Sequence, residues 1–167
     1  AGFKYNLTDI ASAIGIEQLR KIDRFQQRRT ELAGRYDAAL AGLPLTLPAR
    51  PAPGSGSTHA WHLYVVRLNG AAPDGGDSAG AADAAGTTGI GRDALIARLA
   101  ERGIGTSVHF IPLHRQPYWR DSCALRAADF PVAEAAFGAM LTLPLYTRMG
   151  DADQERVKIG RASCRER

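Results

Sequence analysis

GIGTSVHFIPLH, residues 103–114, predicts three successive local structures: the end of a helix, a buried strand and a tight proline turn. Gly103 and Gly105 allow the positive backbone φ values that end a helix and begin a strand. His109 and His114 stand among apolar residues, so we expect both in a largely dry neighbourhood. An imidazole there can exchange protons or hold a substrate. The alternative is that both are ordinary hydrogen-bonded residues of the core or surface.

The region N-terminal to this stretch is strongly helical as far as Leu40. Thr8 or Asp9 can cap its start by accepting a hydrogen bond from a free backbone N–H. Gly15 indicates a bend between two helices, and Gly42 helps to end the second one. The apolar residues recur at helical spacing and predict a buried stripe: Leu7, Ile10, Ile14, Ile22, Phe25, Leu32, Tyr36 and Leu40.

Three short apolar or β-branched segments predict strands, and three further segments predict helices. The strands are 62–68, 104–111 and 141–145, and residues 45–58 form an extended, proline-rich connection before the first of them. The helices are 92–102, with Leu95, Ile96 and Leu99 inward; 117–120, a single turn; and 130–140, with Val132, Ala136 and Met140 on its apolar stripe. Residues 151–157 begin a last helix.

These elements predict an α+β fold, in which helices cover a short, mostly antiparallel sheet and a long N-terminal helix leads in from another domain. We expect residues 1–41 to form interdomain or dimerisation helices and residues 42–157 a small α+β domain. Residues 69–89, rich in Gly, Ala and Asp, are interpreted as a flexible insertion without chemistry. Residues 158–167 lack apolar periodicity and are interpreted as a non-native tail.

Composition excludes several classes of protein. The 167 residues are 45% hydrophobic and 23% charged, which is ordinary for a globular protein. The net charge of +4 is dispersed, without the basic block of a nucleic-acid-binding tail. No apolar run reaches the ~20 residues that span a membrane. Two cysteines without a CxxC pattern argue against a disulfide scaffold and favour a reducing, cytoplasmic location.

A metal site is not expected. His59 and His62 form an HxxH pattern, but it lies in strand-like sequence, where residues of odd spacing point to opposite faces. Zinc also requires more ligands than these two. The nearby aromatic residues are interpreted as packing residues: Trp61, Tyr64, Tyr118 and Trp119.

Seven sequence motifs in order resemble the C-terminal part of the DegT/DnrJ/StrS family of pyridoxal-phosphate (PLP) sugar aminotransferases. They are GFKYNLTDI, IGIEQLRKID, RRTELAGRYDAAL, HAWHLYVVRL, RDALIARLAERGIGTSVHF, PLHRQPYW and LPLY, and the resemblance as a whole runs over residues 2–157. GFKYNL and GIGTSVHF resemble most the branch that makes UDP-4-amino-4-deoxy-L-arabinose for lipid A. The resemblance implies the small C-terminal domain of a fold-type I PLP enzyme.

The resemblance also implies roles for four residues. Family members usually read GxNYR at the first motif, which reaches across a dimer interface to the cofactor phosphate. Here Lys4 replaces the Asn and Asn6 replaces the Arg, and both can donate hydrogen bonds to a phosphate. His109 matches a position that faces cofactor and sugar, where it would orient the nucleotide sugar or relay a proton, and His114 belongs to the neighbouring PLH turn. We therefore expect Lys4 and Asn6 to bind PLP, and the two histidines to bind substrate.

The Schiff-base lysine of the family lies in a large N-terminal domain that this chain does not include. Neither Lys21 nor Lys158 has the right context, so no catalytic residue is assigned and the chain alone should not transaminate. The implied partners are a nucleotide sugar, glutamate or 2-oxoglutarate, and a second copy bound through the N-terminal helices. Neither nucleic acid nor membrane is expected as a partner. The alternatives are a non-catalytic α+β dimerisation or interaction module, a PLP-dependent dehydratase of the same family, and a basic nucleic-acid binder.

Overall fold

Three antiparallel strands form the sheet in the computed structural model, which describes residues 5–70 and 90–159. Their order is β1 (Leu45–Thr46), β2 (Tyr64–Leu68) and β3 (Met140–Leu143). Along β2, alternate side chains are buried, because successive residues of a strand point to opposite faces of a sheet. The α+β class and the small antiparallel sheet expected from the sequence are confirmed.

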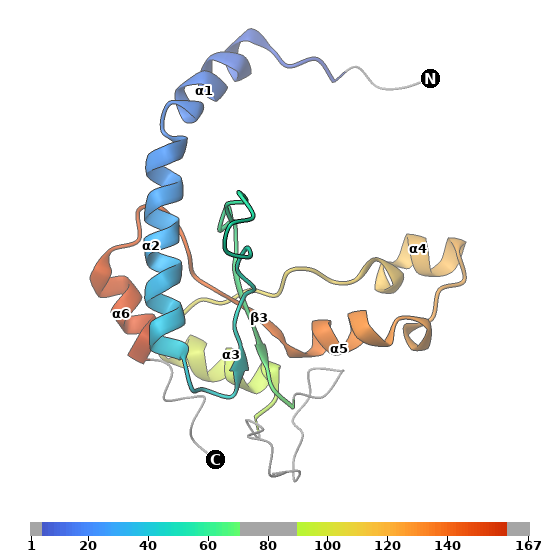
Figure 1. The fold of residues 1–167 in the computed structure, drawn as a ribbon. Helices are drawn as coiled ribbons and strands as arrows, with labels where there is room; N and C mark the ends of the chain where they lie inside the picture. The colour runs from blue at the N-terminus through green and yellow to red at the C-terminus, as the bar shows by residue number, and fades with distance from the viewer. Residues whose placement is uncertain (1–4, 71–89, 160–167) are drawn as a thin grey trace.

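Six α-helices accompany this sheet in the described residues (Figure 1). Thr8 caps the first, accepting a hydrogen bond from the N–H of Ala11 as the sequence predicts. Two short 3₁₀ turns, Leu113–Arg115 and Ala127–Asp129, flank the fourth. The helices are α1 (Asp9–Leu19), α2 (Ile22–Leu40), α3 (Arg92–Glu101), α4 (Pro117–Ser122), α5 (Pro131–Ala139) and α6 (Asp151–Ile159).

The hydrophobic core joins one face of the sheet to α2, α3 and α6. It includes Trp61 and Tyr64, as expected. Other core residues are Leu32, Tyr36 and Leu40 of α2, Val66 and Leu68 of β2, Leu95 and Leu99 of α3, Leu141 and Leu143 of β3, and Val157 of α6. The amide of Gln154 donates to the Leu32 carbonyl over 2.7 Å and ties α6 to α2.

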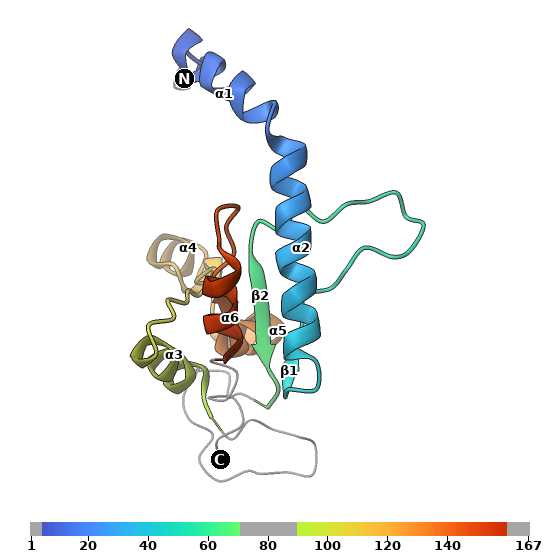
Figure 2. The same ribbon diagram turned by 90° about the vertical axis from the view of Figure 1, so that its left-hand side faces the viewer.

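Two parts of the chain with exposed apolar side chains project from this core, in addition to the loop between β1 and β2 (Figures 1 and 2). One is α1, which extends outward beyond the N-terminal end of α2 at an angle to it and buries none of its residues. The other is the segment 110–130, which carries α4 and extends to the side (Figure 1). Both expose large apolar side chains: Leu7, Ile10, Ile14, Ile16, Leu19 and Ile22 near α1, and Phe110, Ile111, Leu113, Tyr118, Trp119 and Phe130 on the other segment. Tyr118 and Trp119 are therefore not core residues of this chain.

Two sequence predictions about the helices are wrong in detail. The break between α1 and α2 lies at Arg20 and Lys21, not at Gly15, which sits inside α1. A glycine inside a helix costs only about 1 kcal/mol relative to alanine, so α1 continues through it. In α5, Val132 is 83% exposed, and the buried residues are instead Glu134, Gly138 and Ala139.

Two predictions about strands are also wrong. Residues 104–111 do not form a strand; only Ser107 pairs, in an isolated bridge to Thr142. The segment then diverges from β3, because Phe110 and Ile111 turn outward to solvent instead of alternating across a sheet. Conversely, the connection 45–58 begins with a strand, since Leu45 pairs with Leu68.

Several predicted features fall on residues outside the described ranges. They are Lys4, Cys164, nearly all of the insertion 69–89, and residues 160–167 of the interpreted tail. The helix α6 runs to Ile159, two residues into that tail. No helix within the described residues has the length and apolar character needed to cross a bilayer.

Candidate functional site

His109 lines a cavity of about 180 Å³ beside β3. The polar side chains around it come from three segments: His62 just before β2, Thr106 and Ser107 after α3, and Thr142 of β3. Imidazole and hydroxyl groups donate and accept hydrogen bonds without carrying a fixed charge. The cavity is therefore suited to a neutral polar group such as a hydroxyl or carbonyl.

A pair of backbone hydrogen bonds holds this cavity wall together. The N–H of Ser107 donates to the Thr142 carbonyl over 3.2 Å, and the N–H of Thr142 donates to the Ser107 carbonyl over 2.8 Å. This bridge fixes the chain two residues before His109. The Nδ1 atom of His109 then lies 3.0 Å from the Thr142 hydroxyl oxygen, within hydrogen-bonding distance.

Thr106 contributes a buried hydroxyl to the same cavity. Its oxygen has no hydrogen-bond partner among the described residues. A buried polar atom without a partner is unfavourable by roughly 1–3 kcal/mol unless water or a ligand satisfies it. This is the observation within the cavity that points most directly to a bound polar group.

His114 occupies a different environment, in a buried ionic cluster. It is 6% exposed, and its Nε2 lies 2.5 Å from the carboxylate of Glu134, which is 8% exposed. Arg115 donates to the same carboxylate through both Nε, over 2.7 Å, and a terminal guanidinium nitrogen. The His114 ring also stacks on Phe130, with ring centroids 4.6 Å apart. The cluster fixes the PLH turn onto α5.

The carboxylate of Glu134 is held in its ionised form. The Arg115 guanidinium, and after it the hydrogen bond with His114, lower the pKa of Glu134 from 4.5 to about 2. Arg115 also lies over the ring of Phe137, 4.9 Å from its centroid, and the guanidinium of Arg92 lies 5.1 Å from the same centroid. This geometry is that of a structural clamp, with the Glu134 oxygens already engaged.

The structure thus separates the two histidines that the sequence predicts as one substrate site. His109 faces a cavity, whereas His114 is engaged by Glu134 and lines none of the cavities described here. His114 is buried, as expected, whereas the surroundings of the half-buried His109 are less dry than expected, because the next residue, Phe110, is exposed. The sequence does not reveal that the two histidines are separated, because the apolar residues between them suggest a buried segment but are exposed in the structure.

Of the two predicted phosphate ligands, only Asn6 belongs to the described residues. It lies in the extended segment before α1 and is exposed. Lys21 precedes α2 at its N-terminus, and Lys158 forms an ion pair with Glu155. Neither lysine is buried, and neither lines the His109 cavity, the groove beside α5 or the cavity beside Trp61. The described residues therefore provide no lysine suited to a Schiff base with PLP. Of the predicted ligands among them, Asn6 is the one that could contact the cofactor phosphate.

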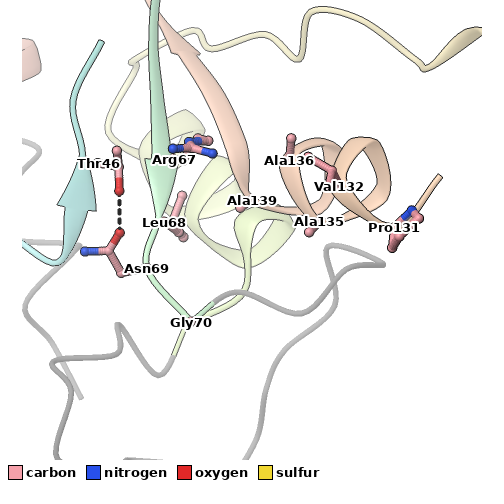
Figure 3. Close-up of a pocket in the computed structure, with 10 residues that line it drawn as sticks. All are labelled: Thr46, Arg67, Leu68, Asn69, Gly70, Pro131, Val132, Ala135, Ala136 and Ala139. Carbon is pink, nitrogen blue, oxygen red and sulfur yellow. Dashed lines mark hydrogen bonds between the residues drawn. The ribbon is translucent and has the colours of Figure 1, made fainter. Parts of the chain in front are cut away.

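Two further cavities lie away from His109. A groove of about 520 Å³ runs between the ends of β1 and β2 and the helix α5 (Figure 3). Thr46, which donates to Asn69 over 2.8 Å, and Arg67 form its polar side, opposite Val132 and Ala136. The other cavity, about 350 Å³, lies between the loop 50–59 and Trp61.

No group of three or more His, Cys, Asp or Glu residues within 5–70 and 90–159 is arranged to hold a metal ion. The HxxH pair diverges: His59 stacks on Trp61, with ring centroids 4.0 Å apart, and accepts a hydrogen bond from the Trp61 N–H. His62 is exposed and lines the His109 cavity instead.

Sequence reasoning missed Glu134, Thr106 and Thr142. Glu134 carried a signal, because it is the one charged residue in the helix PVAEAAFGA. A single carboxylate in a helix of otherwise apolar residues indicates that the carboxylate pairs with a cation or a hydrogen-bond donor when it is buried. Thr106 and Thr142 carried no comparable signal, since isolated threonines are common in strand-like sequence.

Comparison with known proteins connects these features to one family. The DegT/DnrJ/EryC1/StrS aminotransferase family matches residues 1–159. The spore coat polysaccharide biosynthesis protein SpsC of Bacillus subtilis (strain 168) is 37% identical over 157 residues, which are 93% of this chain and 36% of SpsC.

Solved structures agree with this match. TlmJ of Streptoalloteichus hindustanus, an aminotransferase, superposes with a TM-score of 0.74 at 31% identity, over 98% of this chain and 38% of TlmJ. Spr1654 of Streptococcus pneumoniae, described as a sugar aminotransferase and solved in a PLP form, gives a TM-score of 0.77 at 26% identity, over 95% of this chain and 36% of Spr1654.

The chain spans a little over a third of the length of these relatives. The family is PLP-dependent, and the matched part corresponds to the helices and small sheet described above. The chain therefore belongs to the DegT/DnrJ/EryC1/StrS aminotransferase family.

Proposed function

We propose that this chain is the C-terminal portion of a PLP-dependent transaminase that moves an amino group from glutamate to a nucleotide-linked keto sugar. The observation that carries the proposal is the family match over residues 1–159. The polar, uncharged lining of the His109 cavity supports it, because a sugar presents hydroxyl and carbonyl groups.

In this proposal the chain completes a site whose Schiff-base lysine lies elsewhere in the protein, since Lys21 and Lys158 do not fit that role. When bound, PLP supplies the electron sink for amino transfer. The part of this chain is to bind and orient: Lys4 and Asn6 donate hydrogen bonds to the cofactor phosphate, and His109 donates or accepts one at the sugar. On this proposal the chain by itself is inactive.

The proposed substrate is a UDP-4-keto sugar used for the cell envelope, in the cytoplasm. The motifs GFKYNL and GIGTSVHF support a UDP-4-keto-pentose for lipid A modification. SpsC is named for a spore coat polysaccharide, which is also a surface glycan. The proposed assembly is a homodimer through the N-terminal region, where α1 exposes its apolar residues on a helix without buried positions.

His114 has a supporting role in this proposal. Its Nε2 is engaged by Glu134, so it contacts substrate less directly than His109 and mainly fixes the PLH turn beside the site.

The test uses the complete protein that contains this chain, supplied with glutamate and a UDP-4-keto-pentose. We expect transamination, measured as 2-oxoglutarate formed. Replacing His109→Gln should raise KM for the sugar by roughly tenfold, the effect of one lost hydrogen bond to a polar ligand, while KM for glutamate stays the same. His59→Gln, whose ring stacks on Trp61 outside the cavity, is the matched control.

Two results would contradict parts of the proposal. Activity with keto sugars on another nucleotide, but none with UDP sugars, would remove the UDP assignment. Absence of transamination with any keto sugar would remove the enzyme assignment.

The second candidate is a non-catalytic α+β interaction module. The exposed apolar side chains of α1 favour it, because an interaction helix needs such a surface. A complete protein that binds no PLP but still self-associates would support this candidate and exclude the first.

A further inference from the structure

The hydroxyl of Thr142 lies within hydrogen-bonding distance of the ring of His109. Thr142 is 6% exposed, and His109 Nδ1 is the only hydrogen-bond partner of its Oγ1 atom among the residues that the structure describes. The backbone bridge between Ser107 and Thr142 holds the two segments at this separation. The contact is therefore built into the sheet edge and does not depend on a flexible loop.

The direction of this hydrogen bond follows from the donor count. A threonine hydroxyl has one hydrogen to donate and lone pairs to accept with. If the His109 ring donated from Nδ1, the buried Thr142 hydrogen would have no acceptor in the described part of the chain. If the hydroxyl donates to Nδ1, its only hydrogen is used. A buried donor without an acceptor is more unfavourable than a buried acceptor with an unused lone pair. The arrangement in which the Thr142 hydroxyl donates to Nδ1 is therefore favoured.

We propose that Thr142 is a positioning residue that fixes the tautomer of His109. Its hydroxyl donates to Nδ1, so the neutral imidazole carries its hydrogen on Nε2. His109 then offers the cavity a hydrogen-bond donor. In its neutral form it acts as a donor to substrate and not as a base at Nε2.

The same cavity contains the complementary group. The Thr106 hydroxyl is buried there without a partner in the described ranges, so it can accept from or donate to a ligand. A donor at His109 and a hydroxyl at Thr106 together suit a ligand with a carbonyl or hydroxyl oxygen. This step rests on the proposed function, in which that ligand is the keto sugar.

The first experiment reads the tautomer directly. The complete protein is labelled with ring-¹⁵N histidine, and the His109 signals are identified by their loss in His109→Gln. Nitrogen shifts distinguish the protonated ring nitrogen from the one with a lone pair. We expect the hydrogen on Nε2 in the native protein and in Thr142→Ser, and a mixture of both tautomers in Thr142→Val, which keeps the shape but lacks the hydroxyl. A hydrogen on Nδ1 in the native protein, or an unchanged spectrum in Thr142→Val, would overturn the proposal.

The second experiment measures kinetics on the same variants. Thr142→Val should raise KM for the keto sugar roughly five- to tenfold with kcat within about twofold, and Thr142→Ser should restore it. Thr147→Val, at a half-buried position in the turn after β3, is the matched control and should leave both constants unchanged.

The two readouts separate this inference from the function on which it rests. If the tautomer responds as expected but KM does not, the positioning of His109 stands and its contact with sugar is removed from the proposed function. If Thr142→Ser fails to restore the Nε2 tautomer, the effect of Thr142→Val is one of packing, and the inference is wrong.

Discussion

Glu134 shows how much a single residue can decide in a small fold. It receives hydrogen bonds from Arg115 and His114, which lie about 20 positions earlier in the chain. The carboxylate therefore joins α5 to the base of the segment 110–130. A buried carboxylate requires such partners, because removing one leaves an uncompensated charge.

The pH dependence of stability should report this cluster. The folded pKa of Glu134, about 2, lies below its ordinary value of 4.5, so its ionised form stabilises the folded state. That stabilisation is complete above pH 4.5 and is lost as the pH falls toward 2. We expect Glu134→Gln to lower the free energy of unfolding at pH 7, and the difference from the native chain to shrink between pH 4.5 and 2.

Urea unfolding at a series of pH values measures this difference. Glu17→Gln is the control, because its side chain is exposed and its ion pair is with Arg20, the residue that follows α1. If the difference in free energy of unfolding between Glu134→Gln and the native chain stayed constant down to pH 2, the lowered pKa of Glu134 would be wrong.

At this scale the sequence indicated the histidines but not their partners. His109 and His114 were recognisable from their motif, whereas Thr142 lies 33 and Glu134 20 positions from the histidine each contacts. Such contacts depend on how α5 and β3 pack against the segment that carries the two histidines. A single sequence does not reveal that packing.

Elements with a clear period could be predicted from sequence, and those without it could not. β2 alternates buried and exposed residues, and α3 places Leu95 and Leu99 inward as its period predicts. The stripe of α5 was predicted from Val132, Ala136 and Met140, but the helix is rotated. The buried face of α5 carries the small residues Gly138 and Ala139 and the carboxylate of Glu134, which accepts a hydrogen bond from Arg115. Residue size and charge pairing, and not hydrophobicity, therefore distinguish the buried face of this helix.

A matched pair of valine substitutions tests this orientation. Val66 in β2 is 1% exposed and Val132 in α5 is 83% exposed. Val66→Ala should lower the free energy of unfolding by about 2 kcal/mol, from lost burial plus a cavity, and Val132→Ala by less than about 0.5 kcal/mol. Urea unfolding of the chain measures both. A loss above about 1.5 kcal/mol for Val132→Ala would restore the orientation predicted from the sequence.

At the scale of the whole molecule, the described residues form a small core with two projections that expose apolar side chains. The sequence predicted α1 as a helix, and its apolar residues suggested a buried stripe, but the structure leaves every residue of α1 unburied. Ile10 and Ile14 lie on one side of α1, and Ile16 and Leu19 on the opposite side, by the 100° step between helical residues. A helix that is apolar all round is normally buried. Within residues 5–70 and 90–159 nothing covers α1, and no pattern in the sequence specifies what does.

This exposure predicts self-association of the chain when it is produced alone. At tens of micromolar, sedimentation equilibrium should give a mass above the 17.9 kDa of one chain. Replacing Ile10→Gln together with Ile14→Gln should weaken the association by at least about 100-fold, because each of the two buried isoleucines contributes about 1.5–3 kcal/mol and every 1.4 kcal/mol is a factor of ten. The control is Asp23→Gln with Arg24→Gln, two exposed polar positions on α2 whose replacement leaves the net charge unchanged. A native chain that remains monomeric with a well-dispersed NMR spectrum would show that α1 needs no second copy, and would assign its apolar surface to the rest of the protein.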